Sequence, residues 1–180
     1  MKRLLPLLAL LFVAATADET RQYRIAQTAF QDKLYDVAER QLREFLQQFP
    51  NSERADNAAY LLGQAQVKVG QWEAAVKTLQ DAARQWPDKR PDGILFWLGE
   101  AFSHGGKFPE AAARYAELVE KFPRSAHIES ALYGLAFAQL KHGRFQSATE
   151  SLDKLVKLPA KGDMALEAEL LRAQLHLAQG

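Results

Sequence analysis

Apolar and small residues recur along this chain at the three- and four-residue spacing of a helix face, and turn residues interrupt them at regular intervals. The clearest unit runs from Asn57 to Pro87. Its first apolar stripe ends at Gly70, and a second stripe begins at Trp72. Glycine ends helices because it adopts left-handed backbone angles without a Cβ penalty, and proline cannot continue a helix. The pattern therefore predicts two helices joined by a tight turn.

The same punctuation returns along the chain, so the unit is a repeat. Four marks keep one register of 36 or 37 residues: a small residue in the first helix, an aromatic that opens the second, an alanine within the second and a closing proline. In that order, the marks are Ala26, Gly63, Gly99, Ala136 and Ala173; Tyr35, Trp72, Phe108 and Phe145; Ala38, Ala75, Ala111 and Ala148; Pro50, Pro87, Pro123 and Pro159. A period of this length is typical of a solenoid, whose units bury their apolar faces against one another. We therefore predict an all-α solenoid of about four and a half helical hairpins, with repeats at about 19–50, 53–87, 91–123 and 126–159 and a partial repeat at 163–180.

The small residues have packing tasks. A small side chain in the first helix lets the paired helices approach to the usual ~8–10 Å between axes, and the alanine of the second helix provides the matching surface. Glycine follows the first helix at three turns, as Gly70, Gly106 and Gly143. Lys33 occupies that place in the first repeat. Because lysine lacks the backbone freedom of glycine, we expect the first turn to be the loosest.

The first 17 residues have the pattern of an export signal. Lys2 and Arg3 precede an apolar run over residues 4–13, and Ala15 and Ala17 stand just before Asp18. A basic start, a short apolar run and a small-residue site are typical of a secretory signal peptide, here residues 1–17 with cleavage after Ala17. The run is well short of the ~20 residues that cross a bilayer, so we expect no membrane span. The pattern predicts a periplasmic or secreted protein, and an uncleaved anchor or a buried first helix is the alternative.

Composition narrows the chemistry. Cleavage would remove Lys2 and Arg3, which leaves 21 of the 23 basic residues beside 22 acidic ones. A chain this close to neutral lacks the excess of basic residues that is typical of nucleic-acid binding. The chain has no cysteine, which excludes disulfides, thiolate metal sites, thiol nucleophiles and a lipid-acceptor cysteine. The four histidines stand outside any metal-ligand spacing, at His104, His127, His142 and His176. The sequence therefore predicts no enzymatic activity, cofactor or metal.

The order of the marks resembles the tetratricopeptide repeat over nearly all of residues 18–180. The closing phrases at residues 49–52 and 122–125, Phe-Pro-Asn-Ser and Phe-Pro-Arg-Ser, and the aromatic-rich segment at 95–101 are similar to the bacterial envelope subgroup of that family. The subgroup includes the Tol-Pal accessory protein CpoB and the outer-membrane assembly lipoprotein BamD. Since the chain has no cysteine, it departs from the lipoprotein. The resemblance implies a right-handed superhelix that serves as a protein-binding scaffold in envelope assembly or cell division.

The resemblance also implies a binding surface, because the first helices of such repeats line the concave face. We expect a groove with a floor of aromatic rings and an edge of amide and charged groups, suited to an extended peptide or a helix of an envelope protein. Its residues are Tyr23, Gln27, Tyr60, Gln64, Lys68, Phe96, Glu100, His104, Tyr133, Phe137 and Lys141. The alternative is that the rings serve packing between repeats.

The last helix is apolar on more than one side. It begins a fifth repeat at Asp163 and carries leucines that do not fit a single helical stripe, at Leu170, Leu171, Leu175 and Leu177. A terminal repeat normally has a polar outer face, because no neighbour covers it. The sequence therefore leaves two alternatives to a simple scaffold: an oligomerising module that self-associates through this helix, or a fragment of a longer repeat array.

Overall fold

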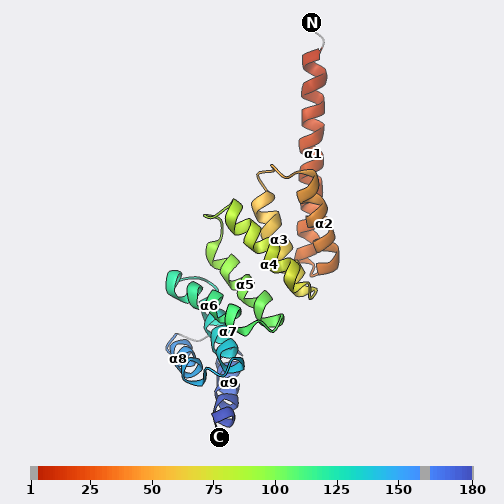
Figure 1. The fold of residues 1–180 in the computed structure, drawn as a ribbon. Coiled ribbons are helices and arrows are strands. Elements are labelled where there is room, and N and C mark those ends of the chain that lie inside the picture. The colour runs from red at the N-terminus through yellow and green to blue at the C-terminus, as the bar shows by residue number, and fades with distance from the viewer. Residues whose placement is uncertain (1–3, 159–162, 180) are drawn as a thin grey trace.

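The computed structural model describes residues 4–158 and 163–179, which form nine α-helices and no strand (Figure 1). The helices are α1 (Leu4–Gln31), α2 (Tyr35–Gln48), α3 (Ala55–Lys68), α4 (Trp72–Gln85), α5 (Pro91–His104), α6 (Phe108–Lys121), α7 (Ile128–Lys141), α8 (Phe145–Val156) and α9 (Asp163–Gln179). Each helix packs against the one before it and the one after it. The prediction of an all-α solenoid of helical hairpins is confirmed.

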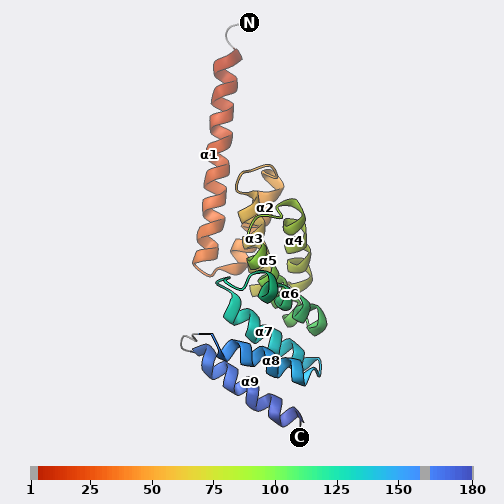
Figure 2. The ribbon, with the colours of Figure 1, turned by 90° about the vertical axis from the view of Figure 1, so that its left-hand side faces the viewer.

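The helices form two layers. The odd-numbered helices, here called the inner helices, contact one another from α1 to α9. Among the described residues, no two even-numbered or outer helices approach each other in this way. In a curved stack the layer on the concave side is the shorter one, so its helices lie closer together. The inner helices contact one another, and they therefore line the concave side. Figures 1 and 2 show the resulting elongated stack, with α1 at one end and α9 at the other.

Helix α1 continues without a break through the predicted cleavage site at Ala17. The first half of its ribbon extends beyond the ends of the other helices, and the second half packs beside α2 and α3 (Figures 1 and 2). The leading segment is therefore not a helix buried within the stack. Within the described residues, no helix has both the length and the apolar character needed to cross a bilayer. Residues 1–3 of the predicted signal lie outside the described part of the chain.

The small marks lie at the closest contacts within the hairpins. The alanines of the outer helices are at most 1% exposed: Ala38, Ala75, Ala111 and Ala148. At Gly63 and Gly99, the two glycines among these marks, the closest neighbour is a large side chain one turn beyond the alanine of the outer helix. A Cβ built on Gly63 would lie 2.5 Å from Leu79 Cδ2, and one on Gly99 would lie 2.5 Å from Tyr115 Cε1. Real Cβ atoms essentially never come this close to another atom, so a side chain at either position would force Leu79 or Tyr115 to move.

The turn after α1 has the same geometry as the turns that contain glycine. Lys33 adopts a left-handed φ of 61°, beside 78° at Gly70 and 73° at Gly106. The Leu34 N–H donates to the Ala29 carbonyl at 2.9 Å, as the Gln71 N–H donates to Gln66 at 2.8 Å. The expectation of a looser first turn was wrong, because the backbone hydrogen bonds that close a helix end fix the turn whichever residue occupies it. Pro159, the closing proline of the fourth repeat, and Gly180, which stands where the turn glycine of the partial repeat is expected, lie outside the described residues.

Replacing Lys33 by glycine should raise the free energy of unfolding by about 1 kcal/mol. A left-handed residue other than glycine costs about 1–2 kcal/mol, and the greater freedom of glycine in the unfolded chain offsets part of that gain. Urea denaturation followed by circular dichroism measures the change. The matched control is Gly106→Lys, which should lower stability by a similar amount. An unchanged midpoint for Lys33→Gly would show that the left-handed turn at Lys33 carries no strain.

Candidate functional site

The structure places all eleven predicted groove residues on the inner helices α1, α3, α5 and α7, but at different depths. Three are buried, namely Tyr23, Gln64 and Phe96. Five are half-buried, namely Gln27, Tyr60, Glu100, Tyr133 and Phe137. Three are exposed, namely Lys68, His104 and Lys141. Their role in binding stays a prediction, and the accessible part of the surface is its polar and basic edge.

Three aromatic rings of the expected floor, those of Tyr23, Tyr60 and Phe96, contact residues of the following repeat. Tyr23 is only 8% exposed, and the amide of Asn57 donates a hydrogen bond to its hydroxyl. Phe96 is 9% exposed and stacks on the His127 ring at 4.6 Å, with 8° between the ring planes. The Arg90 guanidinium lies 5.5 Å from the centroid of the Tyr60 ring. Tyr23, Tyr60 and Phe96 therefore contribute to packing between repeats, and their role in binding stays a prediction.

An acidic residue lies one helical turn before each ring and also contacts the following repeat. The guanidinium of Arg54 lies 3.3 Å from Glu19, and that of Arg90 lies 2.9 Å from Asp56. Arg90 reaches this position from a left-handed backbone with φ of 51°. We call this arrangement the junction clasp: an acid and an aromatic on one inner helix, and a basic residue that enters from the next repeat. Its three instances are Glu19, Tyr23 and Arg54; Asp56, Tyr60 and Arg90; Asp92, Phe96 and His127.

Two serines add a hydrogen bond to the clasps. Ser52 Oγ donates to Glu19 at 2.6 Å, and Ser125 Oγ donates to Asp92 at 2.6 Å. Each hydroxyl also accepts the backbone N–H two residues further on. The hydrogen bond from Ser125 lowers the pKa of the Asp92 carboxyl below its ordinary value of 3.8. The junction clasps were not predicted from the sequence, although their acidic residues Glu19, Asp56 and Asp92 recur at the 37- and 36-residue spacing of the repeat.

Basic side chains mark the last position of three inner helices, where they are favoured by the helix dipole. Lys68 Nζ lies 5.3 Å from the centroid of a Trp97 ring on the next inner helix, and Lys141 Nζ lies 5.4 Å from that of Phe137. The His104 ring stacks with Trp72 at 6.4 Å. These contacts hold the basic groups beside aromatic surface while leaving them exposed, so they form a row along one edge of the concave face.

The carboxylate of Glu100, a residue of the predicted groove, accepts a hydrogen bond from a buried tyrosine. The Tyr115 hydroxyl, on α6, donates to Glu100 Oε1 at 2.5 Å. Burial, and then the negative charge of Glu100, raise the pKa of Tyr115 far above its ordinary value, so the hydroxyl remains a donor. The ring fits between α5 and α7 because Gly99 and Gly134 both lack a side chain. Sequence reasoning missed Tyr115, which interrupts a row of leucines at the same repeat position.

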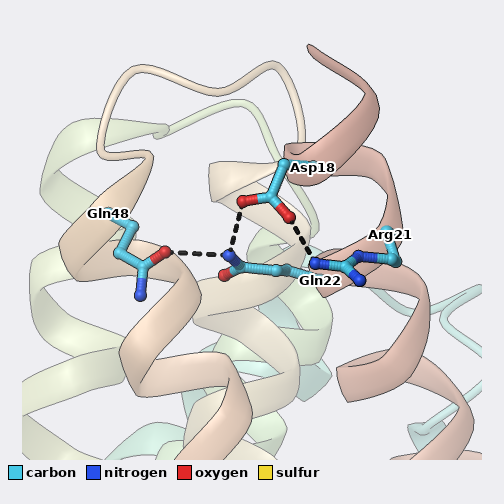
Figure 3. Close-up of polar contacts among 4 residues, drawn as sticks. All are labelled: Asp18, Arg21, Gln22 and Gln48. Carbon is cyan, nitrogen blue, oxygen red and sulfur yellow. Dashed lines mark hydrogen bonds and ion pairs between the residues drawn. The ribbon is translucent and has the colours of Figure 1, made fainter. Parts of the chain in front are cut away.

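A polar cluster joins the packed half of α1 to the end of α2. The Gln22 amide donates to Asp18 Oδ2 and to Gln48 Oε1, both at 2.9 Å (Figure 3). The Arg21 guanidinium donates to the other oxygen of Asp18 at 2.8 Å, and this hydrogen bond lowers the pKa of that carboxyl. The cluster lies directly after the predicted cleavage site at Ala17.

An apolar cavity that the sequence did not predict lies on the opposite, convex side of the stack. It has a volume of about 710 Å³ and lies between the outer helices α4 and α6, with α5 as its floor. Ile94, Leu95 and Leu98 line the floor, and charged side chains of α4 and α6 stand at its rim. Among the described residues, no three His, Cys, Asp or Glu side chains converge as metal ligands would.

These features define an α-solenoid of helical hairpins with a concave layer of inner helices. Models of the tetratricopeptide repeat match residues 23–89, 60–126 and 130–159. The chain belongs to the tetratricopeptide repeat family. Proteins of this family are generally non-catalytic scaffolds for protein–protein interaction.

Solved structures agree with this fold. A tetratricopeptide repeat protein from Parabacteroides merdae superposes with a TM-score of 0.73 at 18% identity; the match covers 90% of this chain and 60% of that protein. YrrB, described as a tetratricopeptide protein with an unusual peptide-binding site, gives 0.70 at 22% identity over 86% of this chain and 75% of its own. MamA gives 0.66 at 20% identity over 91% and 85%. No curated protein sequence matches the chain.

Replacing Asp92 by asparagine should remove a pH-dependent part of the stability. The pKa of Asp92 is lower in the folded chain than its ordinary 3.8, so the stabilisation is fully present above about pH 4 and is lost as the pH falls through the folded-state value. The difference in unfolding free energy between the wild type and Asp92→Asn should therefore be largest at neutral pH and shrink toward pH 3. Urea denaturation across that range measures it.

The exposed Asp88, which lies in the preceding loop, provides the control for the pH series. Asp88→Asn should track the wild type at every pH. A stability difference for Asp92→Asn that stayed constant from pH 7 to pH 3 would contradict the role assigned to the ionised carboxylate.

Proposed function

We propose that this chain is an exported scaffold of the bacterial cell envelope, which binds envelope proteins or peptides through its concave face during envelope assembly or cell division. The observation that carries the proposal is the row of exposed basic residues at the ends of the inner helices, Lys68, His104 and Lys141. A partner segment that lies along the concave face can contact this row together with the half-buried rings beside it. Groups that are already held in place lose little freedom when they bind, which favours affinity.

Export is supported by the sequence of residues 1–17 and by the position of that segment. The first half of α1 extends beyond the stack, and Asp18 is bonded to Gln22, which in turn contacts Gln48 of α2 (Figures 1 and 3). Cleavage after Ala17 would leave the packed half of α1 intact. It would also place Asp18 in the first turn of a helix, where a carboxylate is stabilised by the helix dipole.

Expression of the full chain in a bacterium should yield a mature protein that begins at Asp18. Intact-mass spectrometry of the purified protein measures the loss of residues 1–17. Substituting leucine for both Ala15 and Ala17 should block processing, because cleavage requires small residues at these positions. Recovery of unprocessed wild-type protein would contradict the export proposal without touching the binding surface.

The binding proposal predicts a partner at the concave face. A photocrosslinking residue placed at His104 in cells should give a discrete adduct, whereas one placed at the exposed Lys77 of the outer helix α4 should not. Reversing two charges of the row, with Lys68→Glu and Lys141→Glu, should reduce the adduct about tenfold, which corresponds to about 1.4 kcal/mol of binding free energy.

The matched control is Lys77→Glu with the reporter kept at His104, and it should leave the adduct unchanged. Thermal unfolding should be similar for all variants, because the substituted lysines are exposed. Equal adducts from His104 and Lys77, or an adduct that is insensitive to the charge reversal, would remove the support for the concave face.

An oligomerising module is the second candidate function. It is favoured by three leucines of α9 that the described part of the chain leaves uncovered: Leu166, Leu170 and Leu177.

A further inference from the structure

The junction between α7 and α9, here called the fourth junction, keeps only part of the junction clasp. Glu129 and Tyr133 of α7 continue the series of acids and rings, 37 residues after those of the third clasp. They are four residues apart, which places them on one face of the helix. Met164 occupies the position of the basic residue, 37 residues after His127. A thioether carries no charge, so this junction has the acid and the ring without a base at the clasp position.

A second acid of the fourth junction lies near the same ring. Glu167 occupies on α9 the repeat position that Asn57 occupies on α3. The amide of Asn57 donates to the Tyr23 hydroxyl, so a side chain at this position can reach the hydroxyl of the preceding ring. Burial, and then the negative charge of Glu167, raise the pKa of Tyr133 above its ordinary value, which agrees with that placement. The fourth junction therefore brings two acids to one tyrosine.

These two acids differ from the acids of the first two clasps in having no base beside them. Within residues 4–158 and 163–179, neither Glu129 nor Glu167 forms an ion pair. Glu129 and Tyr133 are half-buried and Glu167 is exposed, so a partner can reach all three side chains. A carboxylate that is partly shielded from water gains most from a hydrogen bond to a cation. The fourth junction is therefore complementary to a positively charged group.

The first two clasps show which positively charged group fits beside such an acid and ring. The Arg54 guanidinium lies 5.8 Å from the centroid of the Tyr23 ring and 3.3 Å from the Glu19 carboxylate. The second clasp repeats the arrangement, with its guanidinium 5.5 Å from the ring centroid and 2.9 Å from the acid. A guanidinium suits this place because it is planar, lies over aromatic rings and donates several hydrogen bonds to carboxylates. The chain thus shows, at two repeats, an arginine bound by the pair of groups that the fourth junction leaves without one.

We infer that the fourth junction binds an arginine side chain of the partner segment, with the guanidinium hydrogen-bonded to Glu129 and Glu167 beside the Tyr133 ring. The inference rests on the proposed function, because Tyr133 belongs to the concave face, and it adds the chemistry of the partner. Glu129 lies in the first turn of α7, whereas the row of exposed basic residues lies at the last positions of the inner helices. The two edges of the concave face therefore carry opposite charges, which favours one orientation of a partner that has both an arginine and an acid.

NMR titration of the full chain with a short peptide tests the inference. The probe is an acetylated and amidated peptide with one arginine among glycines, and its matched control has citrulline, which keeps the shape of arginine without the charge. The arginine peptide should give saturable shifts at Glu129, Tyr133 and Glu167. The citrulline peptide should bind about tenfold more weakly, because the charge-assisted hydrogen bonds are lost. Glu129→Gln with Glu167→Gln should weaken the arginine peptide by about the same factor, whereas Glu120→Gln, at an exposed acid of the outer helix α6, should not.

A variant that completes the clasp within the chain gives the sharpest outcome. Met164→Arg should place a guanidinium where Arg54 and Arg90 stand in the first two clasps. It should therefore raise the Tm and abolish binding of the arginine peptide, because the chain's own side chain occupies the site. The matched control, Met164→Gln, adds a polar group without a charge and should do neither. A Met164→Arg variant that still binds the peptide as the wild type does overturns the inference.

Three further outcomes overturn the inference. The first is equal binding of the two peptides, or binding that the double variant leaves unchanged. The second is a set of shifts caused by calcium chloride and not by the peptide, which indicates a metal ion as the occupant. The third concerns Lys161, which lies outside the described residues. Binding that appears only in Lys161→Ala indicates that a base of this chain already occupies the site.

The failure of this inference differs from the failure of the proposed function. The peptide titration reports on the fourth junction alone, whereas the crosslink at His104 reports on the binding of a partner to the concave face. A discrete adduct at His104 together with no binding of the arginine peptide would remove the inference and leave the proposed function standing. An absent adduct together with specific binding of the arginine peptide would remove the proposed partner in cells and leave the arginine site.

Discussion

The two helices of each hairpin meet where a side chain is missing or minimal, and the curvature and continuity of the stack depend on that contact. Gly99 shows the constraint most clearly, because the Tyr115 ring occupies the space into which a Cβ would project. The same ring reaches Gly134 on α7, so a single side chain fixes the spacing within one hairpin and the spacing to the next. Since protein interiors are closely packed, an added carbon at Gly99 would force the Tyr115 ring to move, so this small residue sets how closely the layers approach there.

Contacts between hairpins are of a different kind. Each junction clasp buries or stacks an aromatic ring and surrounds it with an acid and a base that remain partly exposed. Exposed ion pairs contribute only about 0–1 kcal/mol to stability. The ring therefore supplies most of the stabilisation of the junction. The charges determine which surface of the next hairpin packs there and in which orientation. In a solenoid such nearest-neighbour terms sum along the chain. A ring used in this way has little surface left for a ligand, which is why the accessible part of the concave face is basic and polar.

The sequence was sufficient for the architecture because its signals are local and periodic. Glycines, aromatics and prolines at a constant spacing specify hairpins whatever their neighbours are. The burial of the Tyr23 and Phe96 rings was not predictable in the same way, because it depends on which side chain of the next repeat faces each ring. The spacing shared by Glu19, Asp56 and Asp92 held that information, but it could be interpreted only together with Arg54 and its equivalents. The apolar cavity on the convex side left no periodic signal, since it arises from the separation of α4 and α6 in space.

In a solenoid the concave and convex faces lie on opposite sides of the stack, so a scaffold of this kind can use each face separately. The inner helices present the concave face, whereas the apolar cavity between α4 and α6 lies on the convex side. Binding at one surface does not occlude the other. Under the proposed function, a partner segment that contacts Lys68, His104 and Lys141 together is held by an effective concentration rather than by a single contact. Modest affinity at each of these residues is then sufficient for stable attachment, because release requires the contacts to be lost together.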